Sequence, residues 1–173
     1  DQTPTGSNAG TDQVVCGTSA TLGGNLPAIG TGVWTISAGA GGSVITPSSP
    51  TSPFTGVAGT TYTLTWTISN GVCAVSTDDV QIQLDASPTV SSAGADQNIC
   101  GTSAVLGGNV PVTGTGLWSV VSGAGGSFVL NTNPVTTFNG VAGTTYILRW
   151  TISNGVCPVS TDEVQIRLDQ TPT

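Results

Sequence analysis

The stretch GVAGTTYTLTWTISNGVC, Gly56 to Cys73, returns 84 residues later as GVAGTTYILRWTISNGVC, Gly140 to Cys157. In both copies large apolar side chains alternate with Thr, Ser or other residues, as expected of a strand with one buried face. The alternating apolar residues are Tyr62, Leu64, Trp66, Ile68, Tyr146, Leu148, Trp150 and Ile152. An Asn-Gly pair follows the alternating residues in each copy and favours a hairpin, because both residues tolerate positive φ. One long, one-sided strand is therefore predicted twice.

Boundary peptides recur at the same step. The sequence reads DQTPT at residues 1–5, DASPT at 85–89 and DQTPT again at 169–173. We therefore predict two tandem domains: residues 1–5 end a preceding linker, 6–89 form the first repeat, and 90–173 form the second and end in a linker to a next repeat. The chain is expected to be a piece of a longer secreted protein. Domains of this size bury a modest core, so a covalent staple would matter.

Short alternating segments separated by turn residues fill each repeat, and no apolar pattern of helical period is present. About seven such segments per repeat predict an all-β fold of two immunoglobulin-like β-sandwiches. Three prolines in residues 39–53 argue against a central strand in that segment. All four tryptophans and both tyrosines share the inward parity. The predicted core is therefore built on Trp34, Tyr62, Trp66, Trp118, Tyr146 and Trp150.

Four cysteines, Cys16, Cys73, Cys100 and Cys157, keep one 57-residue spacing in both repeats. An even number per repeat predicts one disulfide within each, Cys16 to Cys73 and Cys100 to Cys157, and hence an oxidising compartment. A bond between repeats, such as Cys73 to Cys100, is the alternative, and free thiols are another. Zinc is disfavoured, because the chain has no CxxC pair and no histidine.

Charge is sparse and negative, with Arg149 and Arg167 as the only cations against nine carboxylates. Nucleic acid is therefore not an expected partner, since phosphate binding needs basic clusters. No apolar run approaches the roughly 20 residues that span a bilayer, so this segment is not expected to insert into a membrane. Without histidine or lysine, serine and cysteine nucleophiles lack their usual bases. We do not expect an enzyme.

Four carboxylates are calcium candidates: Asp85, Asp96, Asp162 and Glu163. In the predicted sandwich they come from the end of the first repeat and from one pole of the second. Oxygen-only ligands suit calcium, and a bound ion would stiffen the linker between repeats. The alternative is that these acids are solvated and keep a nearly cation-free protein soluble.

The motifs AG(T/A)DQ, SA.LGGN, GTG.W, GVAGTTY.L.WTISNG and STD(D/E)VQI.L follow one another in each repeat. This order resembles polycystic-kidney-disease (PKD) type domains. The variant with paired cysteines and the phrase GVAGTTYTLxWTISNGVCxxSTDxVxI resembles the tandem repeats of giant cell-surface adhesins in Bacteroidetes, of the SprB gliding-motility kind. The likeness covers both repeats nearly end to end. PKD domains often carry a WxFGDG motif, which GVWTISAGAGG replaces here, so a role tied to that motif does not transfer.

The resemblance implies a module of an extracellular filament, exported by the type IX secretion system and attached to the bacterial outer membrane. Adhesins of this kind hold surfaces or polysaccharides during gliding, and most of their repeats serve as spacer. The first functional hypothesis is therefore a structural repeat whose partners are its neighbouring repeats. The second is a module that binds glycan or another surface through an exposed aromatic side chain. Inward parity of all four tryptophans weighs against the second.

Overall fold

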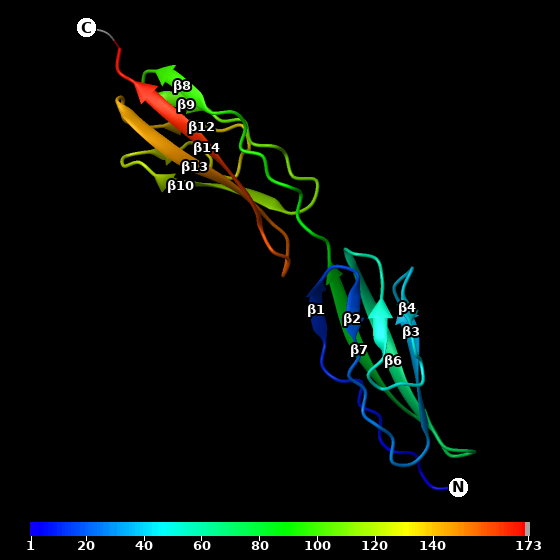
Figure 1. Cartoon of the computed structure of the whole chain (residues 1–173). Coiled ribbons are helices and arrows are strands. Elements are labelled where there is room, and N and C mark those ends of the chain that lie inside the picture. Colours follow the sequence, from blue (N-terminus) through cyan, green and yellow to red (C-terminus); the bar gives the residue numbers. More distant parts are fainter. Residues whose placement is uncertain (172–173) are drawn as a thin grey trace. The chain divides into compact units, whose positions relative to one another are not determined.

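A computed structural model describes residues 1–171. Its contacts divide the chain into two compact units, Asp1–Ala86 and Ser87–Thr173. Each unit is a sandwich of one four-stranded and one three-stranded sheet, and the described residues contain no helix (Figure 1). The predicted all-β fold, two immunoglobulin-like domains of seven strands each, is confirmed.

In unit 1 the four-stranded sheet has the order β1-β7-β6-β3, and the three-stranded sheet has the order β2-β5-β4. Strands β3, β6 and β7 are antiparallel, whereas the edge strand β1 runs parallel to β7. The strands are β1 Gln13–Cys16, β2 Ser19–Thr21, β3 Thr31–Ala38, β4 Ser43–Val44, β5 Pro53–Thr55, β6 Thr60–Ser69 and β7 Ser76–Asp85.

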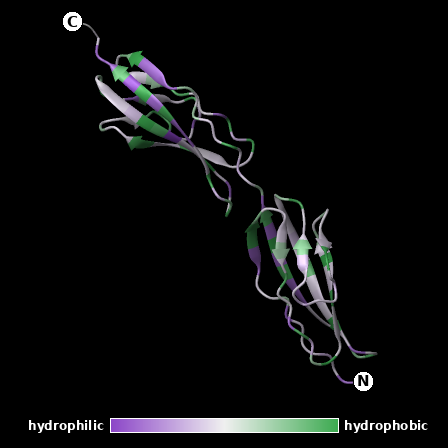
Figure 2. Cartoon of the chain, viewed as in Figure 1, coloured by the Kyte–Doolittle hydropathy of each residue, from purple (hydrophilic) through white to green (hydrophobic). Residues whose placement is uncertain are grey.

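Unit 2 repeats this topology, with sheet orders β10-β13-β14-β8 and β11-β12-β9. Its strands are β8 Gln97–Cys100, β9 Ser103–Val105, β10 Thr115–Ser122, β11 Ser127–Phe128, β12 Thr137–Asn139, β13 Thr144–Ser153 and β14 Ser160–Asp169. Hydrophobic and hydrophilic residues alternate along β14 (Figure 2), as its alternating burial requires. The alternation places one side of the strand in the core and the other in solvent.

The core of each unit lies between its two sheets and is organised by aromatic side chains. Trp34 and Trp66 meet with ring centroids 5.0 Å apart, and Phe54 contacts Tyr62 edge-on at 4.9 Å. The six aromatic residues predicted to form the core are all at most 2% exposed: Trp34, Tyr62, Trp66, Trp118, Tyr146 and Trp150. Their indole and phenol groups keep hydrogen bonds to backbone carbonyls, which offsets the cost of burying a polar group.

The turn between β6 and β7 is wider than a two-residue hairpin. The ladder closes with Ile68 opposite Ser76, leaving residues 70–75 in the loop, and it continues to Thr60 opposite Leu84 without a shift. A two-residue turn at Asn70-Gly71 would have turned Val80 outward, so burial of Val80 requires a bulge or a wider loop. The wider loop is present, and it lies before Ser76 rather than within the strand.

Two details of the predicted layout are wrong. Pro53 begins β5, which is the central strand of the three-stranded sheet, and the first position of a strand tolerates a residue without an N–H. Residues 1–5 are packed against unit 1 rather than forming a linker, since the Thr5 hydroxyl accepts hydrogen bonds from the N–H groups of Ala28 and Ile29 at 3.0 and 2.9 Å. Thr89 makes the same contacts within unit 2, so it belongs to that unit and not to the first repeat.

Candidate functional site at the two poles of the repeat

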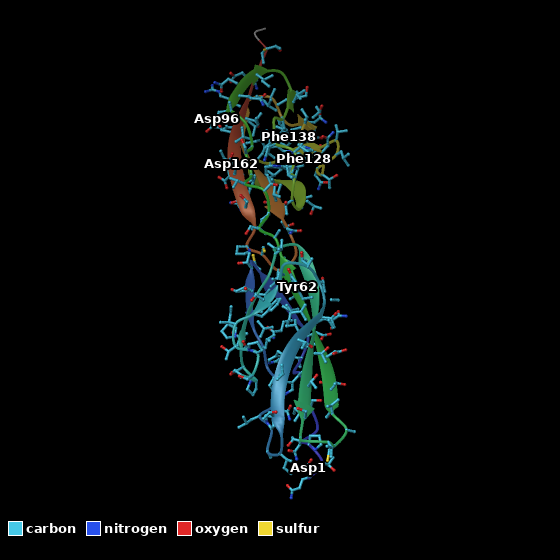
Figure 3. All side chains as sticks on the ribbon, turned by 90° about the vertical axis from the view of Figure 1, so that its right-hand side faces the viewer. Asp1, Tyr62, Asp96, Phe128, Phe138 and Asp162 are labelled. Atoms are coloured by element: carbon cyan, nitrogen blue, oxygen red, sulfur yellow. The ribbon has the colours of Figure 1, made fainter. Side chains whose placement is uncertain are left out.

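The N-terminal pole of unit 1 consists of Asp1, Gln2 and the β6–β7 turn. The Asp1 carboxylate accepts a hydrogen bond from Val72 N–H at 3.0 Å, and the Asn70 side-chain amide donates to the Gln2 carbonyl at 2.7 Å. Cys73 follows directly in this turn. Asp1 lies at one end of its unit (Figure 3). The start of the chain and Cys73 therefore share one pole.

The C-terminal pole lies at the other end of β7, where the chain leaves the unit. Because β1 is parallel to β7, its last residue, Cys16, stands opposite the last residue of β7, Asp85. The next N–H, that of Gly17, donates to the Asp85 carbonyl at 2.9 Å. In unit 2, Cys100 stands opposite Asp169 in the same way.

The two cysteines of one unit are therefore separated by the length of β7. Its ten residues span roughly 30 Å at about 3.3 Å per residue, whereas a disulfide needs Cα atoms about 4.4 to 6.8 Å apart. Cys73 and Cys100 are free thiols, and Cys16 and Cys157 are disulfide-bonded. The predicted pairs Cys16 to Cys73 and Cys100 to Cys157 are wrong, and the alternative Cys73 to Cys100 bond is not present either.

Two of the predicted calcium ligands fasten the leading segment of unit 2 to β14. Asp162 accepts a hydrogen bond from Ala93 N–H at 2.7 Å, and Asp96 accepts one from Gln165 N–H at 2.8 Å. Figure 3 shows the two residues at separate places in the unit. These contacts recur in unit 1 at 2.7 and 2.9 Å, where the acceptors are Asp78 and Asp12. This role was not predicted from the sequence, although each bonded pair keeps its 69-residue separation in both repeats.

The other two candidates also have nearby partners. Glu163 forms an ion pair with Arg149 at 2.6 Å, on a surface where both side chains are over two-fifths exposed. Asp85 is buried and accepts a hydrogen bond from the side-chain amide of Gln83 at 2.7 Å. Within residues 1–171 no three His, Cys, Asp or Glu side chains gather closely enough to hold a metal ion. Calcium binding at these four carboxylates stays a prediction.

None of the tryptophans considered for sugar binding is exposed. The four tryptophans are buried, so none of them is available to stack on a sugar. No pocket is present in the described part of the chain. The outer face of the larger sheet carries rows of small polar residues instead, as where Thr35, Thr65 and Asp79 stand side by side and the Thr65 hydroxyl donates to Asp79 at 2.6 Å. No helix able to cross a membrane occurs among these residues.

No protein-family model matches the chain, and no curated protein matches it. Among solved structures it is similar to immunoglobulin domains 1–4 of Sidekick-1, at 11% identity and a TM-score of 0.60, over 99% of this chain and 50% of that one. It is also similar to the insect immune protein hemolin, whose domain arrangement has implications for homophilic adhesion. That match has 10% identity and a TM-score of 0.55, over 96% of this chain and 47% of hemolin.

A PKD domain from the KIAA 1837 protein matches 48% of the chain at 21% identity and a TM-score of 0.42. The chain spans about half the length of the Sidekick-1 and hemolin structures. At these identities the similarity to those two structures establishes the fold, an immunoglobulin-like sandwich used twice.

Proposed function

We propose that this chain is a structural spacer in a long extracellular filament that attaches a cell to surfaces. One observation carries the proposal: in each unit the leading segment bonds to the start of the last strand, and the chain leaves at the opposite end of that strand. We expect every added repeat to lengthen the chain by about the length of a ten-residue strand, roughly 30 Å. A catalytic domain or a small-ligand receptor has no need of this arrangement.

The surface chemistry supports the same role. Both arginines occur in exposed ion pairs, Arg149 with Glu163 and Arg167 with Asp169. The remaining outer face is mostly Thr, Ser and Gln, which does not favour tight binding of charged partners. Buried aromatics and a pocket-free surface in the described residues add no feature of an enzyme.

We extend this proposal to a filament that is exported by the type IX system, displayed on a bacterial outer membrane and used in gliding. They rest on the resemblance of the repeated motifs to Bacteroidetes gliding adhesins. The disulfide supports an oxidising, extracytoplasmic location. Mild protease treatment of intact cells that carry the protein tests the location. Loss of the repeats from intact cells is expected, and full protection until the cells are lysed would contradict it.

A length series tests the spacer role. Chains of two, four and six repeats are compared by small-angle scattering, and the maximum dimension is expected to grow in proportion to repeat number. A maximum dimension that grows only as the cube root of mass would show compaction and refute the role. A glycan array probed with the two-repeat chain tests the alternative of a glycan-binding module. Saturable binding to a defined glycan would favour that alternative.

A further inference from the structure

We propose that Cys73 and Cys100 are the two halves of a disulfide that joins one copy of this chain to the next, head to tail. Both are free thiols, and both reach the surface: Cys100 is exposed and Cys73 is half-buried. Cys73 lies at the N-terminal pole of unit 1, and Cys100 lies at the C-terminal pole of unit 2.

The internal repeat shows that both positions form disulfides. Cys157 occupies in unit 2 the place that Cys73 occupies in unit 1, in the turn that follows WTISNGV. Cys16 occupies in unit 1 the place of Cys100, at the end of the parallel edge strand. Cys157 and Cys16 are disulfide-bonded. Cys73 and Cys100 therefore have the backbone setting of bonded cysteines.

Each of these cysteines needs a partner from outside its own unit. Within unit 1 the length of β7 separates the N-terminal pole from the C-terminal pole by roughly 30 Å, and a disulfide tolerates Cα separations up to about 7 Å. A cysteine at an N-terminal pole can therefore bond only to a cysteine brought to that pole by another repeat. The other cysteine position of each repeat lies at its C-terminal pole, so that cysteine of the preceding repeat is the partner.

The boundary aspartate shows why the two poles fit. Asp169 stands opposite Cys100, and its carbonyl accepts a hydrogen bond from Gly101 N–H at 2.9 Å. Asp169 also begins DQTPT, the peptide with which Asp1 begins. The Asp1 carboxylate holds the turn of Cys73 through Val72 N–H at 3.0 Å. When a next copy follows directly, Asp169 of the first copy is also Asp1 of the second. That one aspartate would then bond to Gly101, next to Cys100, and to Val72, next to Cys73.

The chemistry is thiol–disulfide exchange with a small disulfide such as oxidised glutathione. The Cys100 thiolate attacks one glutathione sulfur, forming a mixed disulfide and releasing one glutathione thiolate. The Cys73 thiolate of the next copy then attacks the Cys100 sulfur and releases the second. The two protein thiols lose two protons and two electrons in total, and one oxidised glutathione becomes two reduced molecules.

This inference deepens the spacer role and rests on its head-to-tail arrangement. Such a bond would give each junction between copies a covalent link besides the backbone. A filament cut by a protease near residues 169–173 would then stay joined until it is also reduced.

A seamless four-repeat chain tests the inference, with residues 1–168 followed directly by residues 1–173 and oxidised by glutathione disulfide. The number of free thiols is expected to stay at two, as in the shorter chain, and peptide mapping is expected to recover a Cys73–Cys100 peptide. Without the proposed bond the number of free thiols doubles.

Two matched variants identify which copies are joined. Cys100→Ser in the first copy alone should abolish the Cys73–Cys100 peptide and raise the free-thiol count by one. The same substitution in the second copy alone should keep the peptide and lower the count by one. Equal effects of the two substitutions, or a doubled thiol count in the unmutated chain, would overturn the inference. If the chain still lengthens with repeat number in scattering, the spacer role survives that failure.

Discussion

Gly32 tests the packing of the core, because it is the place where strand β3 passes beneath the Trp66 ring. A Cβ at Gly32 would overlap the ring carbons Cζ2, Cη2 and Cε2 of Trp66. The ring has no room to move: its Nε1 donates to the Asn25 carbonyl at 3.2 Å, and it packs on Trp34 at 5.0 Å. Gly32→Ala therefore forces an extra methyl group into a close-packed core.

The expected size follows from two opposing effects. Overpacking of a core costs about 1 to 3 kcal/mol, and loss of glycine's freedom in the unfolded chain returns about 0.4 to 1 kcal/mol. The net destabilisation of unit 1 is about 1 to 2 kcal/mol, which lowers the melting temperature of a domain this size by roughly 5 to 15 °C. Unit 2, with its own Gly116 unchanged, is the internal reference in the same calorimetric scan.

Gly23→Ala is the matched control, since a Cβ there meets no heavy atom within 4 Å and its φ is not positive. We expect this variant to melt at or slightly above the temperature of the wild-type chain. A double-mutant cycle adds specificity: in a Trp66→Ala background, Gly32→Ala should cost nothing further. Equal melting temperatures for the Gly32 and Gly23 variants would refute the packing argument.

Four substitutions test the core and the surface by thermal unfolding. Trp66→Ala should destabilise unit 1 by about 3 to 5 kcal/mol, whereas Thr65→Ala on the outer face should cost little, and equal melting temperatures would mean that the strand parity is wrong. Tyr62→Phe removes a buried hydroxyl that hydrogen-bonds to two backbone groups. The free energy of unfolding should fall by about 1 to 3 kcal/mol. An unchanged melting temperature would show that water replaces the hydroxyl. Arg149→Ala should change stability by less than about 1 kcal/mol, because its ion pair with Glu163 is exposed, and a larger loss measured in high salt would contradict that view.

Much of the fold follows from local pattern. Alternation in residues 62–68 identified the buried face of β6, and the burial of Trp66 and Tyr62 confirms it. Gly32 is the second glycine of the GTG.W motif. Its packing role was not visible, because contact between Gly32 and Trp66 depends on how β3 pairs with β6, and pairing is a long-range property.

The cysteine pairing could not be read from spacing. Equal spacing in both repeats shows that the positions are equivalent, but it does not say at which pole each lies. The direction of β1 decides that question: an antiparallel edge strand would have ended at the N-terminal pole beside Cys73, whereas parallel pairing carries Cys16 to Asp85. The structural role of Asp96 and Asp162 was hidden for a related reason, since each accepts a hydrogen bond from a backbone N–H of a segment distant in sequence.

The parallel pairing of β1 with β7 also determines how a unit responds to tension. Pulling on the two ends of a unit draws β1 toward the N-terminal pole and β7 toward the C-terminal pole. The two strands are then sheared along their length, so the pairs from Gln13–Ile82 to Cys16–Asp85 share the load and must fail together. An antiparallel hairpin pulled at its open end separates one pair at a time. Single-molecule stretching of this chain with its disulfide reduced should therefore give high, evenly spaced force peaks, one per repeat.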